Sequence, residues 1–233
     1  MKFNDLAWAA LLYYYKSSAD RRYIKLFRDT EFISKLRERP WDIPYEEFED
    51  KVIFSFISSI GLRLPTVRGA DNLLTKIIEL HPNISYLKGK RLQDCDLSDE
   101  EVLLNIRQIY EKLQGIHGFW LTGISKIAHV FNEALFAAIN LGTSSYFGLL
   151  GESEDFIKWL RVVQQSAQEV NEDFTSLGLP GSPEDFLSEK LGYTNYGCHK
   201  SLARFLDEYY WLATSENLPV PPRWLPSESW GGK

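Results

Sequence analysis

Apolar residues recur at the spacing of a helix along most of the chain. In residues 5–16 the apolar positions are three or four residues apart: Leu6, Ala9, Ala10, Tyr13 and Tyr14. Residues 44–60 repeat the pattern with apolar side chains four residues apart: Phe48, Val52, Phe56 and Ile60. Such spacing places the apolar side chains on one face of a helix. No alternating pattern typical of a strand extends beyond a few residues, so the sequence predicts an all-α fold.

The same periodicity predicts further helices over residues 21–39, 71–80, 98–114, 121–131, 154–174 and 201–213. Glycines and polar residues between them predict loops at 83–98 and 142–148. Residues 218–233 hold four prolines and Trp224, which predicts an extended Pro/Trp-rich tail. We therefore expect a single compact helical domain over residues 1–233, with possible lobes at 1–97 and 98–233.

Composition and charge narrow the function classes. The chain has 233 residues, of which 44% are hydrophobic and 25% charged, as is typical of a folded protein. A formal net charge of -6 excludes a globally basic nucleic-acid binder. The charge is uneven, because residues 1–40 hold nine Lys or Arg and five Asp or Glu. Arg21, Arg22, Lys25 and Arg28 fall within two turns of one predicted helix, where they could neutralise phosphates or form an ordinary solvated face.

Membrane, metal and cofactor signals are missing from the sequence. No apolar run reaches the roughly 18–20 residues that a membrane span needs, and Asp5 interrupts any signal-peptide pattern. We therefore expect a cytoplasmic protein with no membrane partner. The two cysteines are far apart and the four histidines are isolated from one another, so no metal site is predicted. The common phosphate-loop, dinucleotide, nucleophile-elbow and zinc-protease motifs do not occur, and no cofactor is predicted.

The most informative segment is residues 113–140. A predicted helix ends, Gly115 and Gly118 turn the chain, a second apolar helix follows, and Asn140 ends a further apolar run. This order resembles the helix-hairpin-helix DNA glycosylases, over about residues 100–150. The resemblance implies a helical core in which a flipped-out base enters a cleft between lobes. It also implies a glycine hairpin that holds a DNA phosphate and a carboxylate that stabilises the sugar cation as the base leaves.

Aligning the family's hairpin with Gly118-Phe119-Trp120 assigns the other residues. Thr122 falls where some members carry a nucleophilic lysine, and a hairpin slipped by one residue brings Lys126 there instead. The family's catalytic aspartate corresponds to Asn140, whose amide has no negative charge, so Asp155, Glu152 or Glu154 would have to replace it. The expected catalytic residues are therefore Asn140, Lys126 and Asp155. The expected base pocket is Trp120, His129 and Tyr146, and the expected DNA contacts are Gly115, Gly118, Thr122, Arg21, Arg22 and Lys25.

Three functions follow as alternatives. The first is a DNA glycosylase that excises a damaged or modified base, in repair or in defence against modified foreign DNA. The second is a catalytically silent DNA-binding protein of the same fold, which Asn140 and Trp120 favour. The third is a helical protein–protein interaction module, which the tail favours. Each residue also has a structural explanation: Lys126 could extend along an apolar helix, His129 and the aromatic rings could be core, and Asn140 could cap a helix.

Overall fold

Helices form all the regular structure of the described chain. The computed structural model describes residues 1–17, 19–57, 67–116, 119–216 and 218. Over these residues it contains twelve α-helices and no strand, with 71% of the chain helical. The all-α prediction is therefore confirmed. The predicted tail at 218–233 lies outside the described residues except for Leu218.

The helices follow one another with short connections. The first six α-helices are α1 (Phe3–Lys16), α2 (Ala19–Phe27), α3 (Thr30–Glu38), α4 (Tyr45–Phe48), α5 (Val67–Glu79) and α6 (His81–Tyr86). The next six are α7 (Glu100–Gln114), α8 (Leu121–Phe131), α9 (Leu141–Tyr146), α10 (Ser153–Ser176), α11 (Pro183–Lys190) and α12 (Leu202–Ser215). The shorter or irregular turns are η1 (Pro40–Asp42), the π-helical η2 (Glu49–Ile57) and η4 (Tyr193–Tyr196). Helix α8 coincides with the predicted 121–131 helix.

Local capping explains where the observed helices differ from the predicted ones. The helix predicted over 21–39 is split, because the Asp29 side chain accepts a hydrogen bond from the Phe32 N–H (3.2 Å) and starts α3. The helix predicted over 71–80 is followed at once by α6, with Pro82 in the first turn, where its missing N–H costs nothing. The loop predicted at 142–148 contains α9, because the Asn140 side chain caps that helix.

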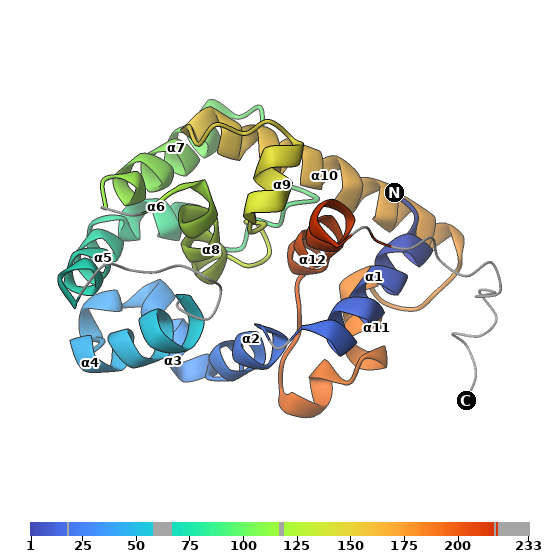
Figure 1. The fold of residues 1–233 in the computed structure, drawn as a ribbon, viewed down its shortest axis with the longest axis horizontal. Coiled ribbons are helices and arrows are strands. Elements are labelled where there is room, and N and C mark those ends of the chain that lie inside the picture. Colours follow the sequence, from blue (N-terminus) through green and yellow to red (C-terminus); the bar gives the residue numbers. More distant parts are fainter. Residues whose placement is uncertain (18, 58–66, 117–118, 217, 219–233) are drawn as a thin grey trace.

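Two groups of helices lie side by side (Figure 1). Helices α3 to α8 form one group, α1, α11 and α12 form the other, and α10 extends along both. Helix α10 packs against α7 in the first group and against α1 and α12 in the second. Helix α1 packs most extensively on α12, so the first and last helices of the described chain are neighbours. The division into lobes at residues 97/98 stays a prediction.

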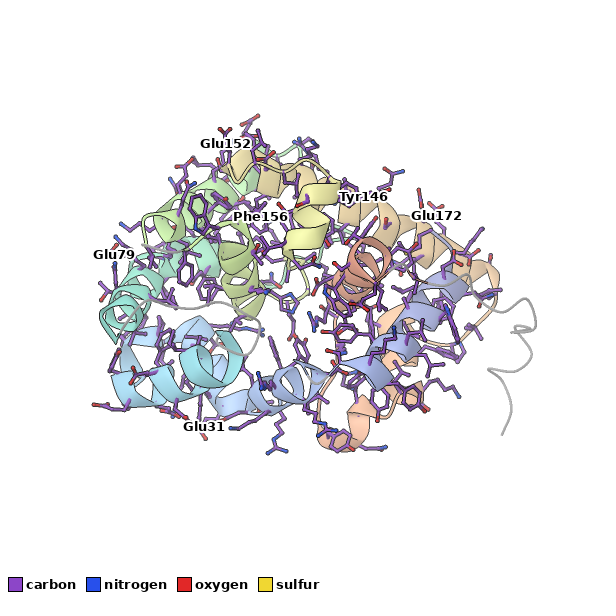
Figure 2. The ribbon with its side chains drawn as sticks, viewed as in Figure 1. Glu31, Glu79, Tyr146, Glu152, Phe156 and Glu172 are labelled. Carbon is purple, nitrogen blue, oxygen red and sulfur yellow. The ribbon has the colours of Figure 1, made fainter. Side chains whose placement is uncertain are left out.

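One large apolar core extends through both groups, from Phe3 to Leu206. Phe156 of α10 lies in it, stacked on Phe136 with ring centroids 5.8 Å apart, whereas Glu31, Glu79, Glu152 and Glu172 lie around the rim (Figure 2). No helix in the described part of the chain is long and apolar enough to span a membrane. The shared core fixes the positions of α8, α9 and α12, which carry the candidate site.

Candidate active site

An extended buried segment, residues 136–139, leads from α8 to Asn140. Its backbone polar groups cannot reach water and are satisfied by side chains instead. The His129 ring bonds through Nδ1 to the Phe136 carbonyl, and Trp159 Nε1 donates to the Ala137 carbonyl (3.1 Å). Ser125 Oγ accepts a hydrogen bond from the Ile139 N–H (2.9 Å). These three contacts fix the point at which α9 begins.

Asn140 is the N-cap of α9. Its Oδ1 accepts a hydrogen bond from the Thr143 N–H (2.9 Å), which satisfies one of the free donors at the start of the helix. Its Nδ2 is buried and makes no hydrogen bond to a described residue. An unsatisfied buried donor costs about 1–3 kcal/mol, so this amide nitrogen is a group that a bound acceptor would stabilise.

Asn140 and Lys126 line the same pocket, which has a volume of about 210 Å³. Its wall comes from α1, α8, the start of α9 and α12: Tyr13, Ser17, Lys126, Asn140, Arg204, Asp207, Glu208 and Trp211. The volume is below the roughly 300–1,000 Å³ of pockets for drug-sized ligands. The pocket therefore suits a single base or sugar, and it brings together two of the three residues that the sequence predicted as catalytic.

The Lys126 amine is tuned toward the neutral form. Its pKa is lowered from the ordinary 10.5 to about 8: burial is the main cause, the Asp207 charge opposes the shift, and the Arg204 charge adds to it. A lysine with a pKa near 8 has a substantial neutral fraction close to neutral pH, which is the form that attacks carbon or accepts a proton.

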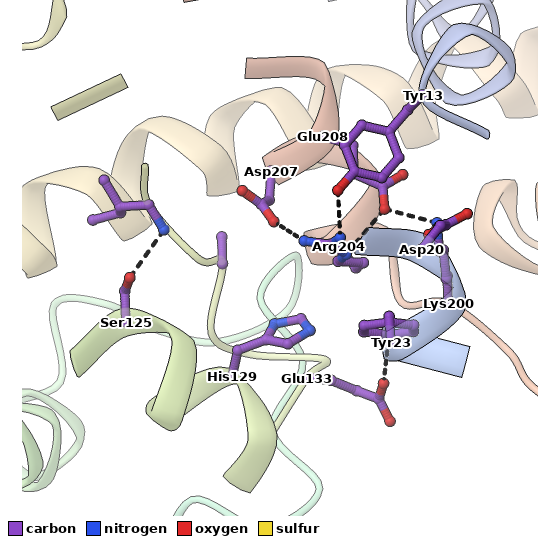
Figure 3. Close-up of polar contacts among 12 residues, drawn as sticks. Tyr13, Asp20, Tyr23, Ser125, His129, Glu133, Lys200, Arg204, Asp207 and Glu208 are labelled. Atoms are coloured by element: carbon purple, nitrogen blue, oxygen red, sulfur yellow. Dashed lines mark hydrogen bonds and ion pairs between the residues drawn. The ribbon is translucent and has the colours of Figure 1, made fainter. Parts of the chain in front are cut away.

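Helix α12 supplies two buried carboxylates to this pocket (Figure 3). Arg204 Nη1 donates to Asp207 Oδ2, and Arg204 Nε lies 2.9 Å from Glu208 Oε1. Burial raises the pKa of Asp207, while Arg204 and Lys126 lower it. Burial also raises the pKa of Glu208 to about 7, against the opposing charges of Lys200 and Arg204. Glu208 therefore exchanges a proton more readily near neutral pH than an exposed carboxyl does.

Behind the pocket, buried charged side chains and tyrosine hydroxyls form a network of ion pairs and hydrogen bonds. Lys200 Nζ, fully buried, lies 2.7 Å from Glu208 Oε1 and 2.5 Å from Asp20 Oδ1. The same amine donates to the Tyr193 hydroxyl (2.7 Å), which in turn donates to Asp20. Arg204 also donates to the Tyr13 hydroxyl (3.0 Å). The network joins α1, α2, η4 and α12. It therefore holds the pocket wall in place and also supplies the charged groups of that wall.

Sequence inspection missed the residues from α12. A signal was present, because Lys200, Arg204 and Glu208 are spaced by four and interrupt an apolar helix: charges on the buried face of a helix need partners. Which partners they find depends on α12 packing on α1, α9 and α10, and no local pattern encodes that packing.

Asp155, the third predicted catalytic residue, lies elsewhere. Its Oδ2 accepts hydrogen bonds from the N–H groups of Leu150 (2.7 Å), Gly151 (2.9 Å) and Glu152 (3.3 Å). With Glu152 it forms the capping box of α10. Glu154, another proposed replacement, pairs with Arg107 (2.6 Å). None of the three carboxylates is among the described residues that line the pocket of Lys126.

The three residues predicted to hold a base do not converge. His129 is buried, and burial together with the charges of Arg204 and Arg37 lowers its pKa to about 3, so the ring stays neutral and serves to hold Phe136. Trp120 and Tyr146 are 72% and 73% exposed. Trp120 immediately precedes α8, and Tyr146 ends α9.

The hairpin was predicted in the segment that connects α7 to α8, and residues 117 and 118 of that segment lie outside the described residues. Gly115 is the C-cap of α7, Gly118 lies outside the described residues, and the Thr122 carbonyl accepts from Ser125 Oγ (3.0 Å). Arg21, Arg22 and Lys25 are exposed on α2. Arg21 lines a groove together with Arg28, whereas Lys25 lines a separate hollow beside Asp29 and Lys51.

Comparisons with protein-family models, curated proteins and solved structures found no match for this chain. Within the described residues, no group of three or more His, Cys, Asp or Glu is arranged to hold a metal ion.

Proposed function

We propose that the protein is a DNA glycosylase that uses Lys126 as its nucleophile. The observation that carries the proposal is the pocket that Lys126 shares with Asn140 and Asp207. The resemblance of residues 113–140 to the helix-hairpin-helix glycosylases supplies the reaction class, and in the slipped alignment of the hairpin Lys126 approaches the lysine position.

Asp207 supplies the carboxylate that the sequence motif lacks. It comes from α12 instead of from the residue before α9, and it lies on the wall of the same pocket. Its charge raises the pKa of Lys126, so the two groups interact electrostatically. In this proposal Asp207 accepts the proton that the attacking amine releases and stabilises the developing positive charge on the sugar.

The reaction is then a displacement at the sugar carbon C1′. The neutral amine of Lys126 forms a bond to C1′ as the bond from C1′ to the base breaks, and the base leaves with the electron pair. The proton that the amine loses passes through Asp207 to the departing base. The sugar ring opens when the bond between C1′ and the ring oxygen breaks, the oxygen takes a proton from water, and a protonated Schiff base forms. Water hydrolyses it to an abasic site and free Lys126, while Asn140 Nδ2 donates to the bound nucleotide.

An abasic-site assay tests the proposal. Single-stranded and duplex DNA with damaged or modified bases are incubated with the protein and then treated with hot alkali. We expect strand breaks on at least one substrate, reduced about 100-fold or more by Asp207→Asn and further by Lys126→Met. Lys158→Met on α10 is the matched control, because that lysine is exposed and makes a long hydrogen bond to the Phe147 carbonyl (3.5 Å). Equal breakage by wild type and Lys126→Met would refute the proposal.

A catalytically silent DNA-binding protein is the second candidate. The pairing of Asp207 with Arg204 favours it, because a carboxylate held by a buried guanidinium is a weaker base. This function predicts salt-sensitive DNA binding without strand breaks on any substrate of the panel.

A further inference from the structure

A basic groove lined with tyrosines lies next to the candidate active site. It has a volume of about 680 Å³ and includes Tyr14, Tyr15, Lys16, Arg21, Arg28 and Tyr196, which we call the tyrosine groove. Ser17 lines both this groove and the pocket of Lys126. The two hollows therefore adjoin each other at Ser17, just after the end of α1.

Three chain segments build the tyrosine groove. The last turn of α1 contributes Tyr14, Tyr15 and Lys16. Arg21 and Arg28 are seven residues apart, at α2 and just after it, so they fall on one side of the helix. Tyr196 comes from η4, which is bounded by Gly192 and Gly197, both in the left-handed region (φ 78° and 66°) that suits glycine.

The charge of the groove favours a polyanion. Lys16, Arg21 and Arg28 are exposed cations, and neither arginine has an ion pair among the described residues. Lys16 lies 4.0 Å from Glu216, with both side chains about half exposed, which is a weak contact. Among the described residues of the wall, the one carboxylate is Asp20, which is turned to the buried Lys200 and is neutralised there.

The aromatic rings favour unpaired bases over a duplex. Tyr15 is 78% exposed and Tyr196 is 55% exposed. Exposed rings between cations form the pattern that binds single strands, because each ring stacks on the face of a base while the cations contact phosphates. Base faces are hidden in a duplex. Tyr14 contacts Tyr15 edge to face (5.5 Å between ring centroids) and also contacts Tyr193 (5.7 Å). Tyr193 is part of the buried charge network, so ring contacts connect the groove to that network.

We propose that the tyrosine groove binds a single-stranded segment of DNA and delivers one nucleotide past Ser17 into the pocket of Lys126. The delivery of a nucleotide into the pocket of Lys126 rests on the proposed function. The inference assigns the substrate class as single-stranded or locally unpaired DNA. The binding half stands on the groove alone and can be tested without any chemistry.

Fluorescence anisotropy with a labelled oligo-dT and a hairpin duplex of the same strand length tests the binding. We expect the protein to bind the single strand more tightly than the duplex. Tyr15→Ala and Tyr196→Ala are each expected to weaken single-strand binding about fivefold or more. The double variant Arg21→Ala, Arg28→Ala should also reduce the slope of log affinity against log salt by about 1.4, since each phosphate contact contributes roughly 0.7.

Matched variants outside the groove are the controls. Trp41→Ala removes an aromatic ring of η1 that is exposed to a similar extent (54%), and Arg39→Ala removes an exposed arginine beyond α3. Both should bind as wild type does. Tighter binding to the duplex, or an unchanged affinity in the groove variants, would overturn the inference. Intact single-strand binding without base release would refute the proposed function but support the groove as a binding site. Base release that the groove variants leave unchanged at low substrate concentration would support the proposed function but refute the role of the groove.

Discussion

Asp207 on α12 and Lys126 on α8 lie on the wall of one pocket, and the Asp207 charge favours the protonated form of the Lys126 amine. Burial acts in the opposite direction and is the stronger effect, which leaves the pKa at about 8. Loss of a negative charge near a lysine lowers its pKa. We therefore predict that Asp207→Asn lowers the pKa of Lys126 below that of the wild-type protein. Titration of ¹³C-labelled lysine followed by NMR measures this value, and an unchanged or higher pKa would contradict the assignment.

The pH dependence of base excision should report the same amine. Only the neutral form attacks C1′, and folding lowers the pKa of Lys126 from 10.5 to about 8. The rate is therefore expected to increase with pH and to level off above about pH 8. Single-turnover rates between pH 6 and 9.5 measure the profile. A rate that is highest at pH 6 and falls as the lysine loses its proton would exclude Lys126 as the nucleophile.

Protein stability should also depend on pH through Glu208. Its pKa is about 7 in the folded protein against an ordinary 4.5, so between these values the folded state binds more protons than the unfolded state. The free energy of unfolding contributed by this group therefore decreases as pH increases from about 4.5 to 7. Urea unfolding of wild type and Glu208→Gln at pH 5.5 and 8 tests this. The stability of the variant relative to wild type should be greater at pH 8 than at pH 5.5; the opposite order would contradict the assigned shift.

Removing a single hydroxyl should disturb the start of α9. Ser125→Ala leaves the buried Ile139 N–H without its partner and is expected to reduce the free energy of unfolding by about 1–3 kcal/mol. Because Asn140 is the next residue, the base-excision rate should decrease with little change in DNA affinity. Thr175→Ala, which removes an exposed hydroxyl bond within α10, is the control. Wild-type stability and rate in Ser125→Ala would show that this contact does not position Asn140.

The sequence predicted those parts of the structure that depend on local pattern. The helix predicted over residues 121–131 is α8. Gly115, the first glycine of the predicted turn, ends α7 as its C-cap. Lys126 and Asn140 could be chosen as candidate residues from the sequence because both belong to one continuous segment, in which a helix, a glycine turn, a second helix and a polar residue follow in the order of the family motif. The split at Asp29 was missed because one capping side chain outweighs a continuous apolar stripe.

The rest of the candidate site depends on contacts between distant segments. Asp207 and Glu208 acquire their environment only when α12 packs on α1, α9 and α10, and no spacing within α12 predicts that Lys126 lines the same pocket. Asp155 had the expected residue type and position in the chain, but its oxygen is engaged by three backbone N–H groups at the start of α10. His129 has the spacing of a site residue, yet its ring holds the Phe136 carbonyl.

The central claim is the bond between Lys126 and the sugar. Trapping with borohydride tests it most directly, because the reagent reduces a Schiff base to a stable amine and fixes the DNA on the protein. The protein is incubated with the substrate found in the abasic-site assay, reduced, digested and analysed by mass spectrometry. We predict one DNA adduct, on the peptide that contains Lys126, and none with Lys126→Met. An adduct on another lysine, or base release without any adduct, would contradict the account.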